Sequence, residues 1–319
     1  MRYIIYGAGA IGGSIGARLY QCGLDVTLIA RGEHFSAISE KGLRYRNPDQ
    51  DVTLPIPVVD HPRAFEFQDD DVVFLTMKSQ HTVGALTDLA AVTTPQTRVI
   101  CCQNGVANER EALRRFTNVY CMVVMLPATY LVAGEVLHNS TTPGGVLDCG
   151  KYPEGVDETI GAVAKDLSEA GYLAQTDPQA MRWKYAKLLG NLGNSVNALC
   201  DARPSDILKQ ARDEALACYA AAGIDCATSE ETKSRYQGIR SGPITGIDRG
   251  GGSSWQSLQR GTGDIEADYL NGEICLLGRL HGVPTPVNRT LQVLANRAVK
   301  LGLKPGAMTP EDIQNAIAK

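Results

Sequence analysis

The segment from Tyr3 to Arg31 constrains the fold more than any other part of this chain. An apolar run at 3–6 leads into the pattern Gly7-Ala8-Gly9-Ala10-Ile11-Gly12, which is followed by a helix-compatible stretch and a second apolar run at 25–30. A G-x-G-x-x-G pattern between a strand and a helix, with another strand after it, predicts a βαβ unit that binds a dinucleotide. The first glycine permits a tight turn, the second lets the backbone approach a pyrophosphate, and the third lets helix and strand pack closely. Free N–H groups and a partial positive charge at the helix start favour phosphates there.

Arg31 stands at the end of the second predicted strand, where NAD-dependent proteins usually carry Asp or Glu to bind the ribose 2′-hydroxyl. A carboxylate would repel a 2′-phosphate, whereas a guanidinium can bind one through paired hydrogen bonds. We therefore predict that this unit binds NADP(H), with Arg31 at the 2′-phosphate. The alternative is a glycine-rich strand–turn–helix of another α/β protein, with Arg31 merely solvated.

Length, charge and cysteine usage narrow the classes of function. The 319 residues predict two domains, and a net charge of −4 without basic runs argues against a nucleic-acid partner. No window approaches the roughly 20 apolar residues that a membrane span needs. The nine cysteines form no C-x-x-C pair and no zinc-type Cys/His spacing, so we expect no metal site and a reducing, cytoplasmic location.

The pattern of apolar runs predicts an α/β fold followed by an all-helical domain. Buried strands are expected at 72–76 and 98–102, antiparallel strands at 119–126, 129–137 and 144–149, a helix near 156–170 and a short strand near Tyr172. We therefore predict a Rossmann-type doubly wound sheet with an antiparallel extension over residues 1–176. Residues 177–319 are expected to form the helical substrate domain, with helices at 180–198, 204–222, 265–280 and 286–301 and a glycine-rich stretch at 238–263. A cleft between two such domains is a common substrate site.

Polar residues that could carry chemistry fall into three groups. Lys78 and Asn104 each follow a predicted strand, where doubly wound sheets bind ligands. Lys187, Asn191 and Asn194 are spaced i, i+4, i+7 and share one helix face. The third group is Ser253-Ser254 with Glu266 and Asp268, of which at most one acid can face a cleft. Each group alone could also be a turn, a cap or a solvated surface.

Together these residues resemble the ketopantoate reductase family over nearly the whole chain. The glycine loop, Lys78, Gln103-Asn104-Gly105, Lys187 with Asn191, Ser253-Ser254 and Glu266-x-Asp268-Tyr269-x-Asn271-Gly272 occur in the family's order and approximate spacing. The resemblance implies NADPH-dependent reduction of 2-dehydropantoate to pantoate in pantothenate biosynthesis. It implies that Lys78 and Asn104 hold the cofactor and that Lys187 protonates the ketone oxygen. It also implies that Asn191, Asn194 and Ser254 bind the substrate, and that Glu266 accepts from its hydroxyl and keeps Lys187 charged.

Some positions depart from the family pattern, and they leave alternatives open. Lys187 stands four residues after Trp183, so Lys184 is a rival, and Ser195 holds the place of a second family Asn. Gly251 and Leu258 replace an Asn and an Asp near the serines. Because these changes fall in the substrate pocket, a reductase of another 2-oxo acid or an imine is one alternative. A non-catalytic NADPH-sensing regulator is another. Which of Ser253 and Ser254 contacts the substrate stays open. The oligomeric state also stays open, and a homodimer is one possibility.

Overall fold

The computed structural model describes residues 1–239, 241–247, 251–261 and 263–319. Five positions of the glycine-rich stretch (240, 248–250 and 262) therefore lie outside the described residues. The chain divides into two compact units. Unit 1 comprises Met1–Gln103, Asn108–Met181 and Glu230–Arg249, and unit 2 comprises Asn104–Ala107, Arg182–Ser229 and Gly250–Lys319.

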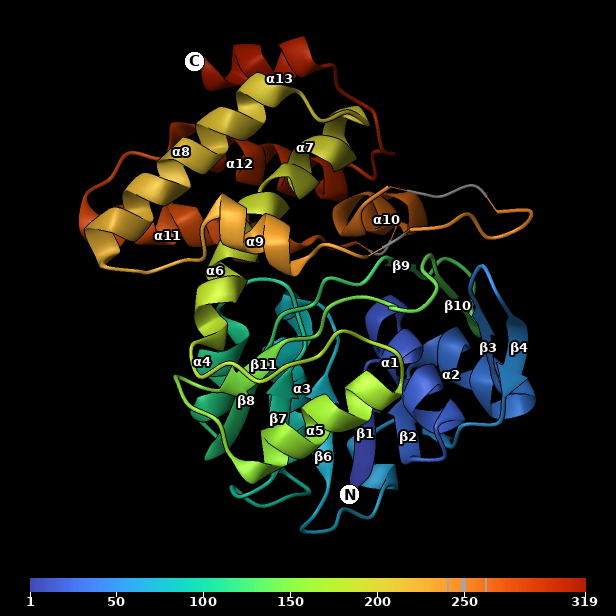
Figure 1. The fold of residues 1–319 in the computed structure, drawn as a ribbon. Coiled ribbons are helices and arrows are strands. Elements are labelled where there is room, and N and C mark those ends of the chain that lie inside the picture. The colour runs from blue at the N-terminus through green and yellow to red at the C-terminus, as the bar shows by residue number, and fades with distance from the viewer. Residues whose placement is uncertain (240, 248–250, 262) are drawn as a thin grey trace. The chain divides into compact units, whose positions relative to one another are not determined.

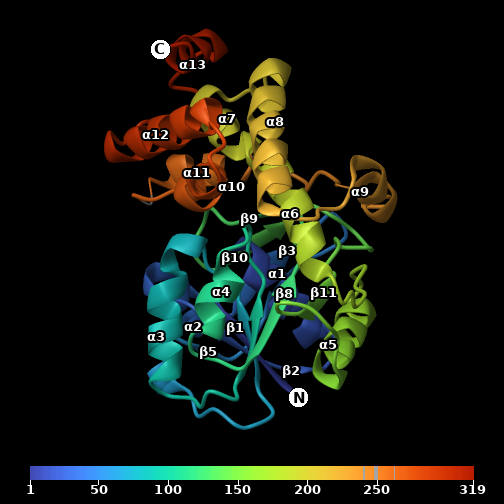
Figure 2. The same ribbon diagram turned by 90° about the vertical axis from the view of Figure 1, so that its left-hand side faces the viewer.

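Unit 1 is built on a seven-stranded sheet in the order β11-β8-β7-β6-β1-β2-β5 (Figures 1 and 2). Its strands are β1 (Arg2–Tyr6), β2 (Asp25–Ile29), β5 (Val58–Val59), β6 (Val72–Leu75), β7 (Arg98–Cys101), β8 (Asn118–Met122) and β11 (Cys149–Lys151). All pairs are parallel except β11 with β8. The strand order reverses between β1 and β6, and doubly wound sheets bind ligands beyond the carboxyl ends of the strands at this point. The predicted fold class is confirmed.

Both faces of this sheet are covered, because successive side chains of a strand point to opposite faces. Tyr3 and Ile5 of β1 belong to a core with α1 (Ala10–Gln21) and α5 (Glu158–Glu169). Ile4 and Tyr6 belong to a second core with α3 (Thr82–Ala90) and α4 (Asn108–Leu113). Figure 2 shows α3 and α5 on opposite sides of the strands. Burial on both faces explains why these strands read as continuous apolar runs.

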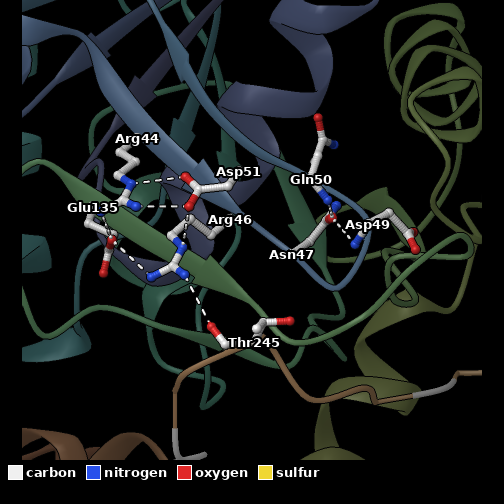
Figure 3. Close-up of polar contacts among 8 residues, drawn as sticks. All are labelled: Arg44, Arg46, Asn47, Asp49, Gln50, Asp51, Glu135 and Thr245. Carbon is white, nitrogen blue, oxygen red and sulfur yellow. Dashed lines mark hydrogen bonds and ion pairs between the residues drawn. The ribbon is translucent and has the colours of Figure 1, made fainter.

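A second, four-stranded sheet in unit 1 was not expected from the sequence. Its order is β4-β3-β10-β9, with β3 (Leu43–Arg46), β4 (Asp51–Leu54), β9 (Ala128–Thr129) and β10 (Glu135–His138). Helix α2 (Gly32–Lys41) precedes it in the chain. Two arginines of β3 and two carboxylates form an ion cluster on this sheet (Figure 3). Arg46 of this cluster also donates to the Thr245 carbonyl at 3.3 Å, which links Thr245 to the second sheet.

The expectation of three antiparallel strands from 119 to 149 was only partly right. β8 joins the main sheet parallel to β7, and only β11 is the antiparallel extension. The run at 129–137 became β9 and β10 of the second sheet, and near Tyr172 there are only isolated bridges, such as Leu173 with Val146. Periodicity indicates that a segment is extended, whereas its partner and direction depend on residues far away in the sequence.

Unit 2 is helical. It contains most of α6 (Ala180–Asn191), then α7 (Gly193–Cys200), α8 (Ser205–Ala222), α10 (Ser253–Arg260), η3 (Glu266–Tyr269), α11 (Asn271–His281), α12 (Pro286–Lys300) and α13 (Pro310–Ile317). The helix predicted at 180–198 is interrupted at Leu192, where the Asn271 side chain donates to the Leu192 carbonyl at 3.2 Å. The helix predicted at 265–280 starts as η3 and breaks at Leu270.

The remaining short elements are η1 (Pro62–Ala64), η2 (Ser79–His81) and α9 (Ser229–Arg235). Almost all of α9 packs with unit 1, where Arg235 forms paired hydrogen bonds to the buried Asp148. Burial raises the pKa of Asp148, and the Arg235 guanidinium opposes that rise. Among the helices that the structure describes, none has the length and apolar character needed to cross a bilayer.

Candidate active site

The glycine loop between β1 and α1 leaves room for a ligand at one of its glycines only. Gly7 adopts φ +110°, and a Cβ there would lie 2.8 Å from the Met77 nitrogen. A Cβ at Gly12 would overlap the Gly7 carbonyl and the Thr76 hydroxyl. At Gly9 the nearest atom to such a Cβ belongs to Tyr130, at an ordinary contact distance of 3.9 Å. The protein itself therefore requires Gly7 and Gly12, whereas the open side of Gly9 suits a group from outside the chain.

Hydrogen bonds hold this loop in place while the start of α1 keeps its donors. Gly7 N–H donates to the Ile29 carbonyl at the end of β2 (3.0 Å), and the Thr76 hydroxyl donates to the Gly7 carbonyl (2.7 Å). Gly9 is the N-cap of α1 and provides no side-chain cap. The first turn, which includes Ala10 and Ile11, therefore presents backbone N–H groups, and such a helix start suits an anion. Thr76 is a supporting residue that the sequence analysis did not single out.

Arg31 is the N-cap of α2 and is exposed. It lies two residues after the end of β2, and that strand end also accepts the loop's hydrogen bond. Within the described part of the chain, Arg31 forms no ion pair. Its guanidinium is exposed, and its proposed contact with a 2′-phosphate stays a prediction.

The loops that follow β6 and β7 are joined by buried amides and hydroxyls. Gln103 donates to the Met77 carbonyl (2.9 Å) and to Thr82 (2.7 Å), on either side of Lys78. Thr82 in turn donates to Asn108 (2.7 Å), which donates to Ser79 (3.2 Å). This chain of bonds fixes the backbone that carries Lys78, which is half-buried. The sequence analysis did not single out Thr82 and Asn108, which begin the helices α3 and α4 after these loops.

In unit 2, the ammonium group of Lys187 donates to the side-chain carbonyl of Asn104 at 2.8 Å. These residues are 83 positions apart in sequence, and each was singled out separately. Lys187 is half-buried on α6, whereas its rival Lys184 is only 3 % exposed. An ammonium group carries three N–H donors, and the Asn104 carbonyl accepts one of those of Lys187.

The other predicted residues of unit 2 include two buried polar atoms that no described residue satisfies. These are the Asn191 amide nitrogen and the Ser254 hydroxyl, and Ser254 is only 2 % exposed. Buried polar atoms normally find a partner, so unsatisfied ones in a candidate site point to a ligand. Ser253 instead faces the buried Glu266, with 3.4 Å between its hydroxyl and a carboxylate oxygen. Asn194 lies half-buried at the start of α7.

A polar network inside unit 2 explains several motif residues without a catalytic role. The Ser195 hydroxyl donates to Asn271 (2.7 Å), and Asn271 donates to Asn288 (3.0 Å). Asn288 donates to Glu214 (2.8 Å), whose carboxylate also accepts the Val287 and Asn288 backbone N–H groups at the start of α12. Ser195 therefore works as a structural residue here. Asp268 is likewise held at the surface by Gln292 and Asn296 (2.8 and 2.7 Å).

The two substitutions near the serines have packing reasons. A Cβ at Gly251 would overlap the Trp255 ring, so Trp255 fills the space that a side chain at 251 would need. Leu258 is 4 % exposed within the apolar interior of unit 2, on α10 next to α7. Both changes alter the surroundings of Ser253 and Ser254.

These features define a Rossmann-type protein with an appended helical unit and a lysine–asparagine pair. Family models described as ketopantoate reductase PanE/ApbA and its C-terminal part match residues 3–153 and 179–298. The chain belongs to the ketopantoate reductase family, a Rossmann-type reductase family that uses a nicotinamide cofactor.

Individual relatives extend over nearly the whole chain. A 2-dehydropantoate 2-reductase of Archaeoglobus fulgidus is 28% identical, with 95% of this chain and 99% of the relative covered. The corresponding protein of Pyrococcus horikoshii is 25% identical with the same coverage. A solved PanE/ApbA family ketopantoate reductase from Ralstonia eutropha superposes with a TM-score of 0.79 at 26% identity, covering 95% of this chain and 99% of that one. A D-mandelate dehydrogenase solved with NADH and anilino(oxo)acetate, at 24% identity over 95% of this chain and 99% of that one, shares the fold with a TM-score of 0.80.

Proposed function

We propose that this protein catalyses the NADPH-dependent reduction of 2-dehydropantoate to pantoate in pantothenate biosynthesis. Membership of the family supports the reaction, and curated relatives that span the chain carry this activity as their name. The observation that carries the proposal is the hydrogen bond from Lys187 to Asn104 at 2.8 Å. It joins the expected proton donor to the residue expected on the nicotinamide side.

The residues of unit 1 fit a dinucleotide. The open side of Gly9 and the uncapped start of α1 would receive the pyrophosphate, with the backbone of Gly7 to Gly12 around it. The exposed Arg31 would bind the ribose 2′-phosphate, which favours NADP(H) over NAD(H). Lys78 and Asn104 would hold the cofactor from the ends of β6 and β7. When bound, the cofactor supplies the hydride for the reduction.

Lys187 is the proposed general acid. As the ketone carbon is reduced, negative charge develops on its oxygen, and an ammonium in a partly dry site stabilises that charge and then donates a proton. The Asn104 carbonyl orients the ammonium by accepting one of its three N–H bonds. Asn104 itself is neutral and contributes a hydrogen-bond acceptor, not a charge.

Asn191, Asn194 and Ser254 are the proposed substrate-binding residues. The unsatisfied Asn191 amide and Ser254 hydroxyl would donate to the carboxylate or hydroxyl of the oxo acid. Glu266 would accept from the substrate hydroxyl and favour the charged form of Lys187. We favour Ser254 over Ser253 because Ser253 already has Glu266 as a partner. In this proposal residues 1–176 form the cofactor domain and residues 177–319 form the substrate domain, apart from the segment Glu230–Arg249, which belongs to unit 1. The enzyme is proposed to act in the cytoplasm.

The test is the loss of NADPH absorbance with 2-dehydropantoate, with pyruvate and 2-oxoisovalerate as control substrates. We expect kcat/KM to be highest for 2-dehydropantoate. NADPH binding combined with faster turnover of a control substrate would reject the proposed substrate and direct attention to Gly251 and Trp255. The absence of turnover with every oxo acid would reject a reductase.

A further inference from the structure

His34 is a buried side chain that joins three separate parts of unit 1. It lies in the first turn of α2, three residues after Arg31, and is 6 % exposed. One ring nitrogen, Nε2, is 2.7 Å from the Ala8 carbonyl inside the glycine loop. The other, Nδ1, accepts the Gly134 backbone N–H at 2.9 Å. The ring also packs against Tyr130, with 4.4 Å between ring centroids.

These two contacts determine the tautomer of His34. A backbone N–H can only donate, so Nδ1 must be an unprotonated acceptor. A carbonyl can only accept, so Nε2 must carry the proton that it donates to Ala8. The ring is therefore neutral with its proton on Nε2, and its two hydrogen bonds have opposite directions. A residue in this position must accept on one side and donate on the other.

The Gly134 donor is itself rigidly held. Gly134 adopts φ +78°, and its carbonyl accepts the Arg44 N–H of β3 at 2.9 Å. The next residue, Glu135, is bound by Arg44 and Arg46 at 3.1 and 3.5 Å, so the ion cluster of the second sheet fixes this turn (Figure 3). The second sheet thus provides a fixed point from which His34 reaches the glycine loop.

The Ala8 carbonyl is the other end of this connection, one residue before Gly9. Ala8 is 2 % exposed, and its N–H contacts the Ile29 carbonyl at 3.3 Å. The bond from His34 therefore sets the orientation of the peptide that leads into Gly9.

We infer that His34 is a positioning residue for dinucleotide binding, acting through the Ala8 carbonyl to hold the pyrophosphate-binding loop. This inference rests on the proposed function, because it takes NADPH as the ligand of that loop. His34 touches the loop backbone and is not a catalytic residue. His34 should affect the binding of the pyrophosphate, which NADPH and NADH share. Arg31 should affect the binding of the 2′-phosphate, which only NADPH carries.

Two substitutions separate the two hydrogen bonds. His34→Gln places an amide N–H near the Nε2 position and keeps the donor to Ala8. His34→Asn places an amide oxygen near the Nδ1 position and keeps the acceptor for Gly134, but loses the bond to the loop. We would measure the Kd of NADPH and of NADH by fluorescence, together with the Tm of each ligand-free variant.

We expect His34→Asn to weaken NADPH and NADH equally, by roughly tenfold, while His34→Gln stays within about twofold of the wild type. A merely structural role would lower Tm in both variants and leave both Kd values unchanged, which would overturn the inference. Failure of the wild type to bind either dinucleotide would instead overturn the proposed function.

NMR of the wild-type protein tests the same inference without any substitution, so it does not depend on whether the variants fold. Nitrogen-15 NMR of the histidine ring should show the neutral form with the proton on Nε2, and saturating NADP⁺ should shift that Nε2–H resonance. A proton on Nδ1, or a resonance that NADP⁺ leaves unmoved, would overturn the inference.

Discussion

Replacement of Lys187 by alanine tests the central step of the proposed mechanism. A positioned general acid contributes on the order of 10²–10⁴ in rate, which corresponds to about 3–5 kcal/mol of transition-state stabilisation. Lys187 is half-buried and is aligned by the 2.8 Å bond to Asn104, so we expect a loss of kcat in this range. The Kd of NADPH should change little. Single-turnover reduction of 2-dehydropantoate, measured with saturating NADPH, gives the rate directly.

Asn104 adds an internal check on this reasoning. Asn104→Ala removes one hydrogen bond of the ammonium, and a hydrogen bond to a charged group contributes about 1.5–3 kcal/mol, so we expect kcat to fall roughly 10- to 100-fold. If Asn104 acts through the lysine, the double variant should be no slower than Lys187→Ala alone. Lys184→Ala is the matched control. Near wild-type kcat for Lys187→Ala, with the large loss at Lys184 instead, would refute the assignment.

Three further predictions concern the cofactor, the substrate and stability. Arg31→Ala should weaken the binding free energy of NADPH by about 1–3 kcal/mol and leave the Kd of NADH unchanged. An equal loss of binding free energy for both cofactors would contradict the 2′-phosphate role. Ser254→Ala should raise the KM for the oxo acid more than Ser253→Ala does, and the reverse order in steady-state assays would exchange their roles. Burial, together with the Arg18 guanidinium, lowers the pKa of His138 to about 3. In the unfolded chain, His138 binds a proton at its ordinary pKa of about 6.5, whereas in the folded chain it stays neutral until the pH is much lower. The free energy of unfolding should therefore fall by up to about 5 kcal/mol as the pH drops from about 6.5 towards 3. Urea unfolding across this range would show the fall, and a His138→Gln variant with the same pH dependence would exclude His138 as its source.

The sequence alone determined the parts of this protein that depend on local pattern. The strand, glycine loop, helix and strand from 2 to 29 were predicted almost to the residue, because apolar period and glycine placement are local properties. The resemblance to the family was correct for the same reason, since its motifs are short and lie in a fixed order. The predicted site residues stay predictions, although the structure does bring Lys187 to Asn104.

Tertiary structure alone decided pairing, burial and hydrogen-bond partners. The direction of β8 and the second sheet depend on contacts between segments up to about a hundred residues apart, which no local period encodes. The sequence analysis did not single out His34, because one of its hydrogen-bond partners, Gly134, lies 100 residues away in the sequence. Ser195 and Asp268 carried motif positions, yet their partners Asn271 and Gln292 gave them structural roles. A side chain's chemistry is set by residue type, but its function depends on the neighbours that the fold brings to it.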